Sequence, residues 1–276
     1  MSGSSVFQPV STSGVEIGDL DSFVRGQSTS GSWNRIVFSR IASTNMLGKR
    51  LASSYLNQGL AAEPTILMTV EQTHGRGRLG RDWISPPGGI YATLMVPKTP
   101  QIPLSTLPLA VPTALCRELD EVLDSPVRLK WPNDLMVDGR KLGGVLIETV
   151  GRGATVAVIV GFGVNYARKD AVVGAISILE TAKQAPSLGD LASRLIEATA
   201  REVTEGREMD EVVEEYSTWT LHETGQKMKC RTASGTDSGT FVGFDENGFL
   251  RLQTDRGERT FSAGDVIETG ETEPHV

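Results

Sequence analysis

Residues 127–165 read VRLKWPNDLMVDGRKLGGVLIETVGRGATVAVIVGFGVN. Its apolar, β-branched runs are interrupted at Asp138-Gly139 and again at Gly151-Arg152-Gly153. An Asp-Gly pair between two such runs favours a tight hairpin turn. Strands joined by short turns pair antiparallel, because a parallel pair needs a long crossover. The stretch therefore predicts a largely antiparallel sheet, with strand segments at 127–130, 133–137, 141–149 and 154–165.

The flanking sequence adds helices and a second group of strands. Alternating or continuous apolar runs predict strands, and apolar residues at helical spacing predict helices. The expected strands are 35–41, 65–70 and 90–96; the expected helices are a short one at 19–24 and longer ones at about 46–56, 104–123, 188–206 and 210–219. From about residue 221 to 270, short strands separated by Gly, Asp and Asn turns predict a small β-barrel. The fold class expected is α+β, with a mixed, mainly antiparallel sheet and flanking helices.

Composition limits the function classes. The chain has 276 residues, a net charge of −7 and 39% hydrophobic residues. An acidic chain argues against a nucleic-acid-binding surface, which is usually basic. No apolar run of 18 residues and no signal-peptide pattern occur, so a cytoplasmic protein without a membrane span is expected. Cys116 and Cys230 lie far apart in sequence and are interpreted as ordinary thiols in a reducing compartment.

A local cluster of positive charge stands out against this acidic background. Residues 71–83 read EQTHGRGRLGRDW, in which three arginines alternate with three glycines after a buried strand. Glycine lets the backbone approach a ligand closely, and the arginine fork fits carboxylate and phosphate oxygens. The stretch is typical of a loop that closes over an anion, although a solvated basic loop or an RG-type nucleic-acid contact has the same composition.

Three further motifs have both an ordinary and a functional interpretation. Lys130–Leu135 (KWPNDL) precedes the predicted hairpin, which would bring Asp134 close to Lys141 either as a stabilising ion pair or as part of a site. Ser43-Thr44-Asn45 consists of preferred helix N-cap residues, which can also bind a polar ligand. The G-x-G at 161–163 is weak evidence, because no Rossmann fingerprint follows it, and no P-loop occurs in the chain.

Taken together and in this order, the motifs resemble those of the biotin protein ligases. The motifs are S-T-N at a helix start, Q-T-x-G-R-G-R-x-G-R-x-W, K-W-P-N-D-L, K-L-G-G-x-L-I-E and G-x-G-x-N. The resemblance runs from about residue 35 to 266. It implies a catalytic domain like that of class II synthetases at 35–220 and an SH3-like barrel at 221–270, between a flexible segment at 1–34 and a tail at 271–276.

The resemblance implies a reaction and a set of residues. Biotin and MgATP would form biotinyl-5′-AMP, and a lysine of a biotin carboxyl carrier protein would then accept the biotin. Biotin would be bound by Ser43, Thr44, Asn45, Gln72, Gly75, Arg76 and Gly144. The nucleotide would be bound by Arg78, Arg81, Trp83, Asn133, Lys141 and Asn165. The catalytic residues would be Lys141, Asp134 and Arg78, with Asp134 also expected to hold Mg²⁺.

Alternatives remain at this point. A lipoate or octanoate ligase of related fold attaches a different acid to a similar lysine, but the complete Gly/Arg stretch and the C-terminal barrel favour biotin. A biotin-responsive transcriptional regulator would need a DNA-reading domain, and only about 34 residues precede the first predicted strand. An inactive carrier-binding scaffold is disfavoured because Arg78, Asp134 and Lys141 are intact. A monomer or a homodimer is expected, as is a Gly/Arg stretch that is mobile without ligand.

Overall fold

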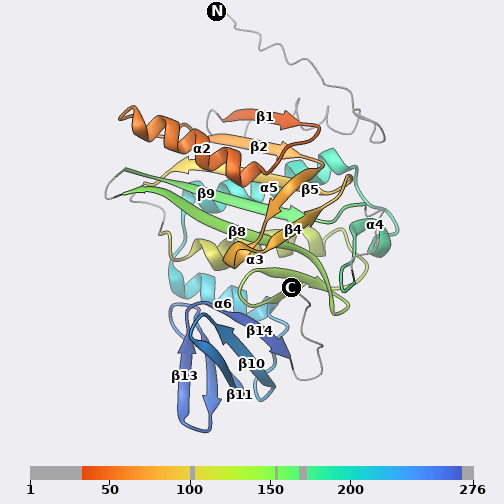
Figure 1. The fold of residues 1–276 in the computed structure, drawn as a ribbon. Coiled ribbons are helices and arrows are strands. Elements are labelled where there is room, and N and C mark those ends of the chain that lie inside the picture. Colours follow the sequence, from red (N-terminus) through yellow and green to blue (C-terminus); the bar gives the residue numbers. More distant parts are fainter. Residues whose placement is uncertain (1–32, 100–102, 153–154, 168–172, 269–276) are drawn as a thin grey trace, which may run out of the picture.

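The computed structural model describes residues 33–99, 103–152, 155–167 and 173–268, and a seven-stranded sheet forms its centre (Figure 1). The strand order is β1 (Asn34–Phe38), β2 (Thr65–Thr69), β5 (Ile90–Pro97), β9 (Thr155–Val164), β8 (Arg140–Arg152), β7 (Asp134–Val137) and β6 (Arg128–Lys130). Only the β1–β2 pairing is parallel among these neighbours. The predicted mixed, mainly antiparallel sheet is confirmed.

Helices cover both faces of this sheet (Figure 1). Helix α2 (Thr44–Asn57) packs on one face, where Met95 and Ile159 are buried against Ala52. Helices α3 (Leu107–Asp120), α5 (Leu188–Glu205) and α6 (Met209–Trp219) belong to the larger core on the other side, which includes Leu94 and Val160. Because successive strand side chains point to opposite faces, the neighbouring pairs 94/95 and 159/160 supply both cores. The short helix α4 (Ile178–Thr181) follows β9.

The Gly/Arg stretch forms a hairpin beside the central sheet. Strands β3 (Gln72–Arg76) and β4 (Asp82–Ser85) pair antiparallel around a 3₁₀ turn, η1 (Arg78–Gly80). A Cβ atom at Gly75 would lie 2.3 Å from the carbonyl oxygen of Trp83, so only glycine lets the two strands approach this closely. The expected loop is therefore a short, paired structure.

The C-terminal strands form a second sheet that shares the core of the first. Its order is β13 (Gly257–Phe261), β12 (Leu250–Thr254), β11 (Gly235–Phe244), β10 (Lys227–Thr232) and β14 (Asp265–Glu268), all antiparallel. The strands at the two edges, β13 and β14, do not pair with one another in the described residues, so the expected closed barrel is found only as a five-stranded open sheet. Phe241 packs in the same hydrophobic cluster as Leu115 of α3.

Several boundaries differ from those predicted. The strand expected at 35–41 ends at Phe38, and Ile41 makes only an isolated bridge to Gln72. The helix expected at 104–123 is confined to Leu107–Asp120. The helix expected at 19–24 and most of the segment at 1–34 lie outside the described residues, as does the tail at 271–276.

Two other observations bear on the sequence predictions. No helix in the described part of the chain is long and apolar enough to span a membrane. Cys116 and Cys230 are buried free thiols, and burial raises the pKa of both, that of Cys230 to about 12. Neither is therefore a reactive thiolate at neutral pH.

Candidate active site

A pocket of about 920 Å³ opens between the central sheet, the Gly/Arg hairpin and the C-terminal sheet. It gathers nearly all of the residues singled out from sequence: Ser43, Thr44, Asn45, Gln72, Arg76, Arg78, Arg81, Trp83, Asn133, Asp134, Lys141, Gly144 and Asn165. Gly75 is not among the lining residues, since it is closed in by β4. Residues more than 120 positions apart in sequence therefore meet in one cavity.

Two glycines on β9 leave room for the side chains of Asn45 and Trp83 at the floor of this pocket. Gly161 and Gly163 lie on the same face of β9, because residues two apart in a strand share a face. A Cβ at Gly161 would lie 1.9 Å from Asn45 Oδ1, and one at Gly163 would lie 2.8 Å from Trp83 Nε1. The G-x-G motif, weak on its own in the sequence, thus allows Asn45 and Trp83 to lie directly on the sheet.

One end of the pocket is a buried network of neutral polar groups at the start of α2. Ser43, the N-cap residue, accepts from the Met46 amide, and the Thr44 amide donates to Gln72 Oε1 over 2.9 Å. Gln72 in turn donates through Nε2 to the Ser85 hydroxyl, 3.0 Å away. The capping role predicted for this motif is confirmed, and the same residues line the cavity.

Asn45 has its polar atoms occupied by protein partners. Its Nδ2 donates to the Leu146 carbonyl over 3.3 Å and to Glu148 Oε2 over 3.2 Å, and its Oδ1 accepts from Thr93 Oγ1 over 2.6 Å. Asn165 also donates to protein groups, the carbonyls of Lys141 (3.3 Å) and Ile176 (3.0 Å). In the structure, both amides hold the walls of the pocket together.

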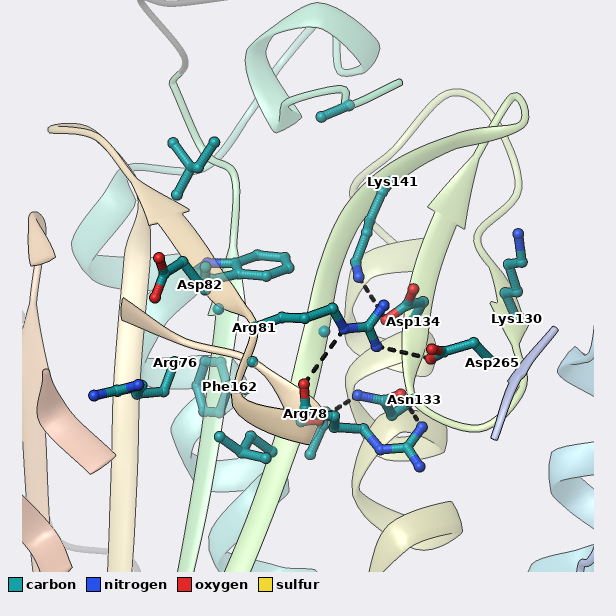
Figure 2. Close-up of a pocket in the computed structure, with 18 of the residues that line it drawn as sticks. Arg76, Arg78, Arg81, Asp82, Lys130, Asn133, Asp134, Lys141, Phe162 and Asp265 are labelled. Carbon is teal, nitrogen blue, oxygen red and sulfur yellow. Dashed lines mark hydrogen bonds and ion pairs between the residues drawn. The ribbon is translucent and has the colours of Figure 1, made fainter. Parts of the chain in front are cut away.

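The other end of the pocket is charged. Lys141 Nζ lies 2.7 Å from Asp134 Oδ1 and 5.0 Å from the centre of the Trp83 ring (Figure 2). The predicted ion pair across the Asp138-Gly139 turn is present, and both turn residues adopt positive φ, as a tight two-residue hairpin requires. Gly144 leaves space beside this pair, since a Cβ there would lie 3.4 Å from Asp134 Oδ1.

The hairpin arginines differ in their surroundings (Figure 2). Arg78 donates to Asn133 Oδ1 over 3.2 Å and to the Gly264 carbonyl over 3.3 Å, and burial lowers its pKa, although an arginine stays protonated. Arg81 pairs with Asp265 over 2.7 Å. Arg76 is exposed and extends away from the Lys141–Asp134 pair.

Some pocket residues were not predicted from sequence. Arg231, Asp265, Val266 and Ile267 reach the pocket from the C-terminal sheet, and Thr93 and Ser85 belong to its buried network. Thr93 lies within an apolar strand and Asp265 lies 184 residues from Arg81. No spacing rule connects such positions, so only the three-dimensional structure could identify them.

Two regions of the chain match known protein families. Residues 37–165 match the biotin/lipoate A/B protein ligase family, and residues 228–267 match the biotin protein ligase C terminal domain, together more than half of the chain. The chain belongs to the biotin protein ligase family. As a member of that family it is a ligase. Both ends of the pocket lie in the first matched region, and the second region supplies part of the pocket wall.

Individual members of the biotin protein ligase family match most of this chain. The biotin–[acetyl-CoA-carboxylase] ligase of Paracoccus denitrificans is 29% identical over 85% of this chain and 100% of its own length. The bifunctional ligase/repressor BirA of Bacillus subtilis is 27% identical over 75% of this chain, which spans 66% of that protein. The solved biotin protein ligase of Aquifex aeolicus in complex with biotin and ATP superposes with a TM-score of 0.68, at 26% identity, over 85% of this chain and 97% of that one.

Proposed function

We propose that this chain is an ATP-dependent biotin protein ligase. The proposal rests on one observation: a single pocket joins a buried neutral network, which includes Thr44, to a charged group, which includes Lys141. A neutral bicyclic headgroup with a carboxylate tail suits such a pocket, with its carboxylate directed to the charged end. The biotin and ATP bound in the Aquifex relative are consistent with this assignment.

In the first step, a biotin carboxylate oxygen attacks the α-phosphorus of ATP and pyrophosphate leaves, giving biotinyl-5′-AMP. Negative charge increases at the α-phosphate, where preorganised cations stabilise the transition state. We assign Lys141, Arg78 and Arg81 to the phosphates and Trp83 to the adenine ring. Asn133 orients Arg78 through the hydrogen bond of 3.2 Å and with Asn165 borders the nucleotide end of the pocket.

In the second step, the amine of a carrier lysine attacks the carbonyl carbon of the mixed anhydride, AMP leaves, and the amine loses a proton. We assign Asp134 to orient this amine. The substrate is a biotin carboxyl carrier domain, as the name of the Paracoccus relative implies for that enzyme. The C-terminal sheet, which supplies Asp265 to the pocket wall, corresponds in this proposal to the SH3-like barrel of the family.

The carboxylates present fit a magnesium ion held mainly by the nucleotide. Mg²⁺ in nucleotide sites uses one or two protein carboxylates and the substrate phosphates. Asp82, Asp134 and Asp265 line the pocket, and the described residues contain no group of three or more His, Cys, Asp or Glu arranged for a metal. We assign Asp134 as the protein ligand; the ion would neutralise phosphate charge.

The test is transfer of labelled biotin to an apo carrier domain with ATP and Mg²⁺, together with biotin-dependent exchange of pyrophosphate into ATP. We expect both activities. Transfer of lipoate or octanoate in place of biotin would assign the chain to the other branch of the matched family. If neither acid is transferred and biotin causes no pyrophosphate exchange, the proposed function is wrong.

A further inference from the structure

Arg231 of β10 lines the pocket from the C-terminal sheet, and its guanidinium has no hydrogen-bond or ion-pair partner among the described residues. Its direct neighbour across the antiparallel pairing is Asp265 of β14. Directly opposed residues of two paired strands present their side chains on one face of the sheet. The Asp265 carboxylate lies 2.7 Å from Arg81 at the pocket, so Arg231 belongs to the same face and the same wall.

Two other cations of the pocket differ from Arg231, because each is paired with a carboxylate. Lys141 pairs with Asp134, and Arg81 pairs with Asp265. Arg231 is half-buried in the wall, and the part of the chain that the structure describes offers it no such pair. An arginine keeps its charge, and its planar fork fits phosphate oxygens. This guanidinium is therefore available to an anionic ligand in the pocket.

The Gly/Arg hairpin shows where along the pocket the C-terminal sheet lies. At the base of the hairpin, Gln72 belongs to the buried neutral network. Midway along it, the Trp83 ring lies beside Lys141. At its turn, Arg78 donates to the Gly264 carbonyl, next to β14. Because a strand advances about 3.3 Å per residue, base and turn lie at opposite ends of the pocket. The pocket therefore runs from the neutral network, past Lys141, to the C-terminal sheet.

In the proposed reaction this order determines where pyrophosphate leaves. The biotin carboxylate reaches the α-phosphorus from the neutral end, beside Lys141. Attacking and leaving oxygens lie roughly in line in phosphoryl transfer. As the carboxylate oxygen bonds to the α-phosphorus, the bond from that phosphorus to the bridging oxygen breaks, and the bridging oxygen keeps the electron pair as part of pyrophosphate. The β- and γ-phosphates therefore point away from the neutral end, toward the wall that carries Arg231.

We propose that Arg231 binds the β- and γ-phosphates of ATP and stabilises the departing pyrophosphate. The inference rests on the proposed function and adds a phosphate contact from the C-terminal sheet. Arg78 and Lys141 lie beside the α-phosphate, which is present in both steps. Arg231 acts only in the first step, because pyrophosphate has left before the carrier lysine attacks.

The test compares two substitutions at this position with a matched control. Arg231→Gln removes the charge, and Arg231→Lys keeps it as a point charge without the planar fork. The control is Arg256→Gln, because Arg256 is an exposed arginine in the turn between β12 and β13 of the same sheet and does not line the pocket.

Two assays separate the steps of the reaction. The first is biotin-dependent pyrophosphate exchange at varied ATP and pyrophosphate concentrations, and the second is single-turnover transfer from synthetic biotinyl-5′-AMP to an apo carrier domain. In Arg231→Gln we expect kcat/KM for ATP to fall about tenfold, and the inhibition constant of pyrophosphate to rise by a similar factor, as for the loss of one charge-assisted hydrogen bond.

The other variants should change less. Both quantities should stay within about threefold of wild type in Arg231→Lys, which keeps the charge, and within about twofold in Arg256→Gln. Transfer from the preformed adenylate should match wild type in all three variants, because the adenylate lacks the β- and γ-phosphates. Inhibition by AMP should be unchanged for the same reason.

The outcomes separate this inference from the proposed function. Normal exchange and normal pyrophosphate inhibition in Arg231→Gln overturn the phosphate role while biotin ligation stands. Slower transfer from the adenylate with unchanged exchange also overturns it, because the contact would then be with the carrier domain. Equal losses in both assays overturn it as well, since they would reflect a distorted pocket. A wild-type chain without biotin-dependent exchange overturns the proposed function and this inference with it.

Discussion

At one end of the pocket, Ser43, Thr44 and Asn45 are only 2%, 3% and 6% exposed, and their hydrogen-bond partners are neutral apart from Glu148, which accepts from Asn45. At the other end, the side chains of Lys141 and Asp134 are 34% and 27% exposed and attract each other by charge. Salt screens exposed charges but hardly affects buried neutral hydrogen bonds. The two ends therefore differ in kind: the buried end offers hydrogen bonds that salt hardly affects, and the open end offers charge.

The substitution Lys141→Ala should have the largest effect on activity, and the effect should be confined to the charged end of the pocket. It removes the cation beside Asp134 and leaves that carboxylate near the phosphates, so we expect biotin-dependent pyrophosphate exchange to fall by about 10²–10³. Binding of biotin alone should change little, because the buried end is untouched. Lys229→Ala, at an exposed lysine of β10, is the control. Equal losses in biotin binding and in exchange would show that the two ends are not separable.

The substitution Arg78→Ala should have an intermediate effect. It removes a cation and two hydrogen bonds, to Asn133 and Gly264, that fasten the hairpin over the pocket. We expect biotinyl-5′-AMP to leave about tenfold faster, since hydrogen bonds from charged groups contribute roughly 1.5–3 kcal/mol. Premature release should biotinylate bystander proteins non-selectively. Retention of labelled adenylate is the measurement, with Arg50→Ala on the exposed side of α2 as control; normal retention would contradict the phosphate role.

The pair between Arg81 and Asp265 should have the smallest effect. Their side chains are 45% and 19% exposed, and exposed ion pairs typically contribute 0.2–1 kcal/mol. A double-mutant cycle of Arg81→Ala and Asp265→Ala, followed by urea unfolding, should give a coupling energy in that range. Limited proteolysis of the hairpin, with and without biotin and ATP, tests its predicted mobility in the same variants. A coupling energy above about 2 kcal/mol would contradict the description of this pair as an exposed ion pair.

Local sequence patterns predict many turns, caps and strand pairs of this protein, because these features depend on interactions between nearby residues. The Asp138-Gly139 turn, the pairing of β7 with β8 and the cap at Ser43 all depend on neighbours within a few residues. The motifs at the two ends of the pocket also lie in one matched region, residues 37–165. Their individual roles in binding and catalysis stay predictions.

The remainder depends on contacts between distant residues. Thr93 resembles any β-branched strand residue until Thr44 and Asn45 are placed beside it. Whether the C-terminal sheet closes depends on how β13 and β14 are positioned, which turn spacing does not specify. The glycines of the Gly/Arg stretch predict an open loop, because glycine is not typical of strands. In the structure, their missing side chains make the pairing of β3 with β4 possible.

The hydrogen bond from Arg78 to Gly264 joins residues 186 positions apart. Such a contact can form only after nearly the whole described chain has left the ribosome, and the entropy of closing so long a loop must be overcome before it contributes stability. The residues of the buried polar network, which lie between Ser43 and Thr93, are all synthesised before this wall of the pocket. A chain that terminates before β14 would lack this wall, and its pocket would be open to water on that side.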